Sequence, residues 1–169
     1  MANKTLGELL SRYNPDGIQR DIITSASAYK CRVDKQHKLM ELTVDLPRIY
    51  FKQDIRRLED EIKKAYELNY VHVITHYGRD LFRDDCVDEM LQELQYRGAV
   101  AKGFFYDYDY TVDNTNKTID IKIGFSNGGI DLMYSDNTHI IASQILRDEY
   151  DVDYTVNIIR DEKKAEKLE

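Results

Sequence analysis

The stretch that decides the fold runs from Lys117 to Ile159 and reads KTIDIKIGFSNGGIDLMYSDNTHIIASQILRDEYDVDYTVNII. Isoleucines alternate with polar residues over 118–123, which predicts a strand with one buried face. A Gly128-Gly129 pair then starts a short helix, Ser135 to Thr138 forms a polar turn, and a second helix and a last strand follow. The predicted order is strand, helix, turn, helix, strand.

The turn between the two predicted helices decides what this segment could bind. In nucleic-acid-binding KH domains the corresponding turn carries a Gly-x-x-Gly, whose glycines let the backbone approach phosphates. Ser135-Asp136-Asn137-Thr138 contains no glycine. The segment is therefore predicted to have the shape of a KH core without its phosphate-binding loop.

Length and composition indicate an ordinary globular protein. The chain has 169 residues, of which 42% are apolar and 33% charged, so either one domain or two small subdomains is expected. No apolar run approaches the roughly 20 residues of a membrane span, and the N-terminus lacks a basic and then apolar leader. These features predict a cytoplasmic protein without membrane association. Cys31 and Cys86 lie far apart in the sequence and are expected to be reduced and structural.

Charge is divided unevenly along the chain. Residues 1–80 contain 14 Lys and Arg against 12 Asp and Glu, whereas residues 81–169 contain 10 against 19, a net charge of −9. A phosphate backbone would be repelled by the second half.

The first half is predicted to fold as helix, strand, strand, helix, strand. Thr5 and Glu8 have the spacing of a capping box, and the stretch 18–25 has no clear pattern. Strands over Ala28–Val33 and Leu39–Leu46 flank a polar turn and form a hairpin, with alternating apolar residues in the second strand. Helical spacing of apolar residues over Lys52–Leu68 and a β-branched run over Tyr70–Thr75 complete this half.

The second half repeats this order with one extra helix. A helix is expected over Arg83–Tyr96, a hairpin over Phe104–Val112 and Lys117–Gly124, and then the segment described first. The predicted fold class is α+β, with two small subdomains in which helices cover a sheet containing an antiparallel hairpin. The boundaries are 1–78 and 79–160, and 161–169 is expected to be a charged linker.

Two pairs of residues have a spacing that raises the question of metal binding. His72 and His76 are four residues apart, but on a strand that separation is roughly 13 Å, too far to share an ion. Asp107 and Asp109 lie about 7 Å apart on one strand face, where two carboxylates could share a divalent ion. A solvated strand face is the favoured alternative for these two aspartates. No metal site is predicted.

Two groups of residues are candidates for an interaction surface. Tyr106, Tyr108 and Tyr110 alternate on one strand and could stack on unpaired bases, although their neighbours are acidic rather than basic. Packing against a helix or against a protein partner is the favoured interpretation. The other group is the basic residues of the 52–68 helix, where acids are interleaved and a solvated face is favoured over a DNA-tracking ridge. These basic residues include Lys52, Arg56 and Arg57.

No motif in the chain predicts catalysis or a cofactor. Phosphate-binding and dinucleotide-binding loops, a nucleophile elbow and paired cysteines are all absent from the sequence. The run from Gly124 to Gly129 lies between a strand and a helix, where an anion could meet the helix N-terminus, but no Lys or Arg follows it. It is interpreted as a turn and helix start.

Three segments and their order resemble a known family. They are Lys30-Cys-Arg-Val-Asp-Lys, Phe51-Lys-Gln-Asp-Ile-Arg-Arg-Leu-Glu-Asp-Glu-Ile and Leu68-Asn-Tyr-Val-His-Val. With the order of elements, they look like the N-terminal region of bacterial PolC-type DNA polymerase III alpha subunits. The similarity covers nearly the whole chain.

This resemblance implies a docking role rather than chemistry. The family's N-terminal region precedes an OB-fold domain, a PHP domain interrupted by a proofreading exonuclease, and the polymerase core. The parent protein would be a DNA-directed DNA polymerase, but none of the family's catalytic carboxylates falls in this chain. The first subdomain would be similar to a truncated KH unit and to the C-terminal domain of the clamp-loader tau subunit, and the second to a type II KH fold. Expected partners are replisome proteins such as clamp-loader or other polymerase-associated subunits. The alternative is a stand-alone KH-like protein that binds single-stranded nucleic acid.

Overall fold

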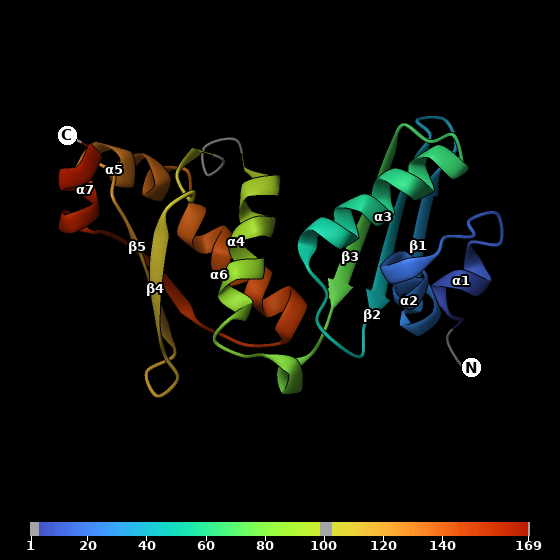
Figure 1. Cartoon of the computed structure of the whole chain (residues 1–169), viewed down its shortest axis with the longest axis horizontal. Helices are drawn as coiled ribbons and strands as arrows, with labels where there is room; N and C mark the ends of the chain where they lie inside the picture. The colour runs from blue at the N-terminus through green and yellow to red at the C-terminus, as the bar shows by residue number, and fades with distance from the viewer. Residues whose placement is uncertain (1–3, 99–102, 169) are drawn as a thin grey trace. The chain divides into compact units, whose positions relative to one another are not determined.

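A computed structural model of the chain describes residues 4–98 and 103–168 (Figure 1). The chain divides into two compact units, Met1–Leu81 and Phe82–Glu169. Each described unit contains one three-stranded mixed sheet with helices against it. The fold class is therefore α+β with two small subdomains, as the sequence predicts.

Unit 1 is built on the sheet β1-β2-β3, in which β1 and β2 run antiparallel and β2 and β3 run parallel. A parallel pair needs a crossover connection, which helix α3 provides. Two short helices precede the sheet, and α2 and α3 contact each other. The elements are α1 (Leu6–Leu9), α2 (Gly17–Ser25), β1 (Ser27–Asp34), β2 (Leu39–Asp45), α3 (Lys52–Ala65), β3 (Tyr70–His76) and a 3-10 turn (Arg79–Leu81).

Local sequence explains most of these elements. The Thr5 hydroxyl accepts from the Glu8 amide and the Glu8 carboxylate accepts from the Thr5 amide, which is the predicted capping box. The apolar residues of β2 face the core beside those of β3, where Leu42 pairs with Val73. Helix α3 buries Ile55, Leu58 and Ile62, which form the apolar face that the helical spacing predicts.

Glu59 closes the outer edge of β3. Its Oε2 accepts from the Val73 amide at 2.7 Å and lies 3.1 Å from His72 Nδ1, while its Oε1 accepts from Arg56 at 2.6 Å. An open strand edge presents unpaired N–H groups to other chains. The buried Glu59 carboxylate thus replaces a neighbouring strand at this point.

Unit 2 has the element order α, β, β, α, α, β, followed by one more helix. In its sheet β4-β5-β6, β4 and β5 run antiparallel and β5 and β6 run parallel. Helices α4 and α6 lie side by side against the sheet (Figure 1). The order of the first six elements is the one that the sequence pattern predicts. The elements are α4 (Cys86–Arg97), β4 (Tyr108–Asp113), β5 (Thr118–Ile123), α5 (Asn127–Ser135), α6 (Thr138–Tyr150), β6 (Thr155–Arg160) and α7 (Glu162–Leu168).

The central strand β5 organises the core of unit 2. Ile119, Ile121 and Ile123 are fully buried, and Ile121 pairs with Tyr110 of β4 and Ile158 of β6. The polar residues between them lie on the opposite face, where Asn157 donates to Asp120 at 3.0 Å. This alternation is the one that the sequence pattern predicts.

Several predicted boundaries are wrong. The stretch 18–25 without a clear pattern belongs to α2, because Ile22 and Ile23 are buried and place it against the core. Helix α3 ends at Ala65 rather than Leu68, because the chain turns at Glu67, which takes a left-handed conformation. Strand β4 starts at Tyr108 rather than Phe104. The Phe104 ring instead packs on the Phe125 ring, with the ring centres 4.6 Å apart.

The predicted linker over 161–169 is also wrong. Residues Glu162–Leu168 form helix α7, which packs on unit 2 with Ala165 buried. The Asp161 side chain accepts from the amides of Lys163 and Lys164 and so starts the helix. The prediction failed because the segment is rich in charged residues and the alanine that packs against unit 2 gives only a weak apolar signal.

No helix among the described residues is long and apolar enough to cross a membrane.

Candidate interaction surfaces

The turn between α5 and α6 is tight and acidic. The Asp136 amide donates to Leu132 and the Asn137 amide to Tyr134, and Asn137 takes a left-handed conformation with φ 58°. Asparagine tolerates that conformation better than most residues, so the chain turns here without glycine. Ser135, Asp136 and Asn137 are all exposed. A carboxylate therefore stands where a KH domain would present glycine amides to a phosphate.

The side chains around this turn fix it to the sheet and leave apolar groups exposed. The Tyr134 hydroxyl accepts from the Ile158 amide at 2.9 Å, and the Tyr134 ring lies 4.4 Å from the His139 ring. Leu132 and Ile140, on the two helices that flank the turn, are 50% and 56% exposed. Helices α5 and α6 and the turn between them form a helical hairpin. We name its exposed residues Leu132, Asp136 and Ile140 the hairpin surface. Apolar side chains beside a carboxylate suit a protein partner better than a phosphate backbone.

Two of the three candidate tyrosines donate hydrogen bonds to a helix of unit 2. The hydroxyls of Tyr108 and Tyr110 donate to the two oxygens of Asp88 on α4, at 2.6 and 2.9 Å. Burial and then this carboxylate raise the pKa of Tyr110 to about 12, and they raise the pKa of Tyr108 still further. Both rings are half-buried, 6.3 Å apart, and serve to hold β4 to α4. Tyr106 differs, since it precedes β4 and is 65% exposed.

The candidate basic residues of α3 are engaged with neighbours in unit 1. Lys52 is buried rather than exposed as the sequence predicts, and its Nζ donates to Thr75 at 3.1 Å. Arg56 donates to Glu59, and Arg57 to Glu61 at 3.0 Å. Only Arg57 has most of its side chain exposed. These basic residues belong to unit 1 and the candidate tyrosines to unit 2, so the two groups do not form one site within a unit.

Lys164 of α7 lies between the two aspartates considered for metal binding. Its Nζ lies 2.6 Å from Asp107 Oδ1 and 3.4 Å from Asp109 Oδ2. The two carboxylates do share one cation, but that cation is a lysine from the predicted linker. His72 and His76 instead face Glu59 and Asp45 respectively. Within residues 4–98 and 103–168, no group of three or more His, Cys, Asp or Glu could hold a metal ion.

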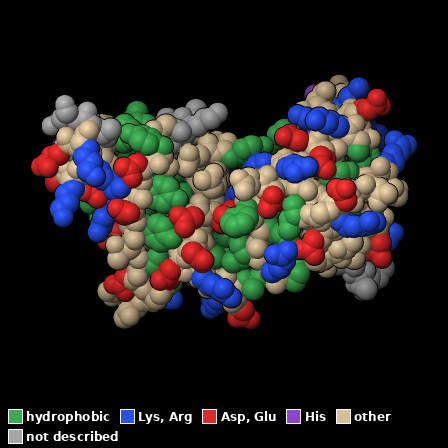
Figure 2. Space-filling view, in the orientation of Figure 1, with side chains coloured by type: hydrophobic (Ala, Val, Ile, Leu, Met, Phe, Trp, Pro, Cys, Tyr) green, Lys and Arg blue, Asp and Glu red, His purple; other side chains and the backbone are tan. Residues whose placement is uncertain are grey.

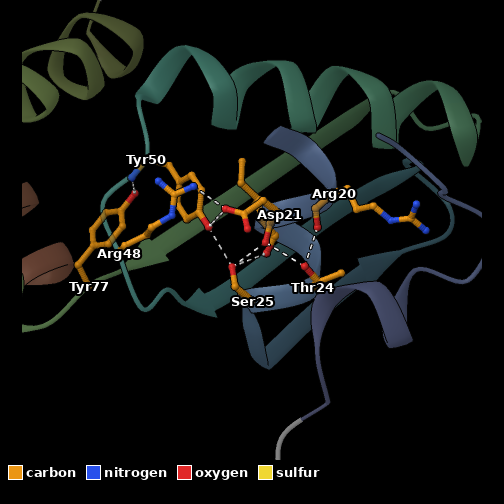
Figure 3. Close-up of polar contacts among 8 residues, drawn as sticks. Arg20, Asp21, Thr24, Ser25, Arg48, Tyr50 and Tyr77 are labelled. Carbon is orange, nitrogen blue, oxygen red and sulfur yellow. Dashed lines mark hydrogen bonds and ion pairs between the residues drawn. The ribbon is translucent and has the colours of Figure 1, made fainter. Parts of the chain in front are cut away.

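A polar network in unit 1 was missed by the sequence reasoning. Asp21 Oδ2 accepts from the Tyr50 hydroxyl at 2.6 Å and from Arg48 at 2.5 Å, and Ser25 Oγ lies 3.0 Å from the same hydroxyl (Figure 3). The Arg48 guanidinium also lies 4.2 Å from the centre of the Tyr50 ring. The Tyr50 amide in turn donates to the Tyr77 hydroxyl.

The chemistry of this network indicates a structural role, in which it holds two segments of unit 1 together. Burial and the hydrogen bond to Asp21 raise the pKa of Tyr50, so its phenol is a poor base for activating Ser25. Ser25 also bonds the Asp21 carbonyl within its own helix, at 2.7 Å. The network therefore joins α2 to the connection between β2 and α3. No sequence spacing could indicate it, because its members come together only when that connection folds over α2.

Comparisons with known proteins leave the family open. No family model matches the chain. No curated protein matches it either. Five chains of solved structures match, and one of them is described as "Crystal structure of APE1850". That chain is 17% identical, the match covers 83% of this chain and 92% of that one, and the TM-score is 0.31.

Proposed function

We propose that this chain is a non-catalytic protein-interaction module at the N-terminus of a PolC-type bacterial DNA polymerase III alpha subunit. The parent protein would be a cytoplasmic DNA-directed DNA polymerase, and the partner a replisome protein such as a clamp-loader subunit. The proposal starts from the resemblance of the three sequence segments, and the division of the chain into two compact α+β units supports it.

The observation that carries the docking role is the hairpin surface. A KH domain that grips nucleic acid needs backbone amides and positive charge at the turn between its helices. This turn presents Asp136, with Leu132 and Ile140 exposed on either side of it. An exposed apolar pair beside a carboxylate is a composition expected of a protein interface.

The first test is binding to purified clamp-loader subunits, measured by calorimetry with the whole chain. We expect saturable binding that Leu132→Asp or Ile140→Asp weakens at least tenfold, since each buries a charge at the interface. Gln144→Asp adds the same charge at an exposed polar position of α6 and should leave the affinity unchanged. Equal binding by all four proteins, or none by the wild type, would reject the assignment of the hairpin surface to these partners.

The second test concerns the parent protein. If this chain precedes a polymerase, the reading frame continues beyond Glu169 into OB-fold, PHP and exonuclease sequences. A stop codon shortly after Glu169 would reject the polymerase part of the proposal.

A stand-alone single-strand nucleic-acid-binding protein is the second candidate. The exposed ring of Tyr106 favours it, because exposed aromatic rings stack on unpaired bases. The adjacent Asp107 and the net charge of −9 over residues 81–169 oppose it. Anisotropy titrations with single-stranded DNA and RNA at low salt decide between the two. Tight, salt-dependent binding supports this candidate, and a flat titration removes it.

A further inference from the structure

The helical hairpin carries negative charge and no Lys or Arg. The sequence from Gly124 to Leu146 contains two acids, Asp131 and Asp136, and no basic residue except His139. Both carboxylates are exposed, and neither forms an ion pair with another described residue. The His139 ring packs on the Tyr134 ring instead of facing either carboxylate within ion-pair distance. The two carboxylates are therefore available to a cation of a partner.

The basic residues that flank this stretch in the sequence have acids of their own. Lys122 lies directly opposite Asp109 in the β4–β5 ladder. The Arg147 Nε atom lies 2.7 Å from a carboxylate oxygen of Asp153. The hairpin thus differs from the start of β4, where Lys164 offsets part of the negative charge.

Apolar side chains are exposed on the same hairpin. Leu132 is 50% exposed and Ile140 is 56% exposed. Leu132 follows Asp131 directly and lies one helical turn before Asp136, whose amide donates to the Leu132 carbonyl. Figure 2 shows hydrophobic side chains at the surface over α5. A partner would meet apolar groups and uncompensated carboxylates together.

This combination selects among the classes of partner. A nucleic acid would bring phosphates against the two carboxylates and be repelled. A second copy docked through the same surface would place like charges opposite each other, which is costly. Lys and Arg side chains, in contrast, pair with carboxylates while their aliphatic stems cover apolar neighbours. The complementary partner is a protein segment with both basic and apolar side chains.

We propose that the hairpin surface, together with Asp131, binds an amphipathic protein segment in which Lys or Arg stands beside apolar side chains. The basic groups pair with Asp131 and Asp136, and the apolar groups cover Leu132 and Ile140. This inference rests on the proposed function, because it names the chemistry of the partner at that same surface.

The test uses the whole chain and three synthetic amphipathic peptides of equal length, built from Leu with Lys, Gln or Glu. Amide NMR shifts caused by the Leu-Lys peptide should saturate, centre on residues 130–141 and weaken as salt is added. The Leu-Gln peptide should bind about tenfold more weakly, because two exposed ion pairs are lost, and the Leu-Glu peptide should not bind measurably. Equal binding of the Lys and Gln peptides would overturn the proposal, as would shifts spread over the other acidic residues of the chain.

Charge variants separate the hairpin carboxylates from the overall negative charge of the protein. Asp131→Lys and Asp136→Lys should each weaken binding of the Leu-Lys peptide about five- to tenfold. Glu166→Lys makes the same change at an exposed position of α7 and should leave the affinity unchanged. Equal weakening by all three variants would overturn the proposal in favour of non-specific attraction. Shifts of the same amides caused by single-stranded DNA, or by raising the protein concentration alone, would overturn it in favour of nucleic acid or of a second copy.

The outcomes also separate this inference from the proposed function. If Leu132→Asp weakens clamp-loader binding but Asp136→Lys and added salt do not, the basic partner is rejected and the proposed function stands. If the Leu-Lys peptide binds at residues 130–141 and no clamp-loader subunit binds, the basic partner is supported and the proposed partners are rejected.

Discussion

Gly124 is the residue on which the packing of α7 depends. A Cβ built there would lie 2.8 Å from Lys164 Cβ and 2.9 Å from the Lys164 carbonyl carbon. Side-chain carbons do not approach that closely, and one of these atoms belongs to the backbone, so the helix would have to move. Gly124 thus acts as the contact point for a helix that the sequence alone presents as a charged tail.

Gly124→Ala should lower the free energy of unfolding of unit 2 by about 1–3 kcal/mol, as overpacking does. Amides of α7 should exchange faster in the variant, since its packing is lost. Urea denaturation and hydrogen exchange measure the two effects. Gly128→Ala is the control, because its Cβ would have nothing closer than 3.8 Å and alanine favours a helix. Equal stability of the Gly124 variant would disprove this account of α7.

Burial and then the Asp88 carboxylate raise the pKa values of Tyr108 and Tyr110. Because their pKa values are raised, the stabilisation from Tyr108 and Tyr110 is complete below the ordinary tyrosine pKa of about 10 and is lost as pH rises through the folded values. Asp88→Asn should lower both pKa values, which tyrosinate absorbance during alkaline titration measures. Asp148→Asn removes the same charge elsewhere in unit 2 and should leave the titration as in the wild type. Superimposable curves for Asp88→Asn would show that burial alone causes the shift.

Strand β3 has an edge that a helix side chain protects. The Glu59 carboxylate takes the Val73 amide that an added strand would otherwise take. A helix that contributes a charged acceptor to a strand edge joins two elements and prevents pairing with another chain.

Glu59→Ala should cost about 1–3 kcal/mol, because it leaves the buried Val73 amide without its acceptor. It should also promote association at high concentration, through the opened edge. Chemical denaturation and light scattering measure these outcomes. Asp60→Ala, one residue along and exposed, should stay within about 0.5 kcal/mol of the wild type. If the two variants behave alike, Glu59 does not protect the edge.

Across the whole chain, carboxylates with lowered pKa values occur in both units. In unit 1, hydrogen bonds from Tyr50 and then Arg48 lower the pKa of Asp21, and the His37 amide lowers that of Asp34. In unit 2, the Asn116 amide lowers the pKa of Asp113. Each therefore contributes stability that is present above the ordinary aspartate pKa of about 3.9 and is lost as pH falls through the folded value.

We expect the urea midpoint of the chain to fall between about pH 6 and about pH 3. Asp113→Asn should reduce this loss for unit 2, because the amide has no proton to take up in that range. Circular dichroism at the two pH values provides the measurement. A midpoint that does not change with pH would contradict the assigned pKa directions.

Sequence by itself determined the α+β class, the order of the strands and helices in unit 2, the capping box at Thr5 and the missing glycines between α5 and α6. These follow from local rules, since alternation, helical spacing and turn chemistry act over a few residues. Tertiary structure alone decided that Lys52 is buried, that Tyr108 and Tyr110 bind Asp88, and that residues 162–168 form a packed helix. Each of these depends on which distant segment lies nearby. The residues around Gly124 in the sequence do not indicate that it contacts Lys164, and those around Asp88 do not indicate that it accepts from two tyrosines.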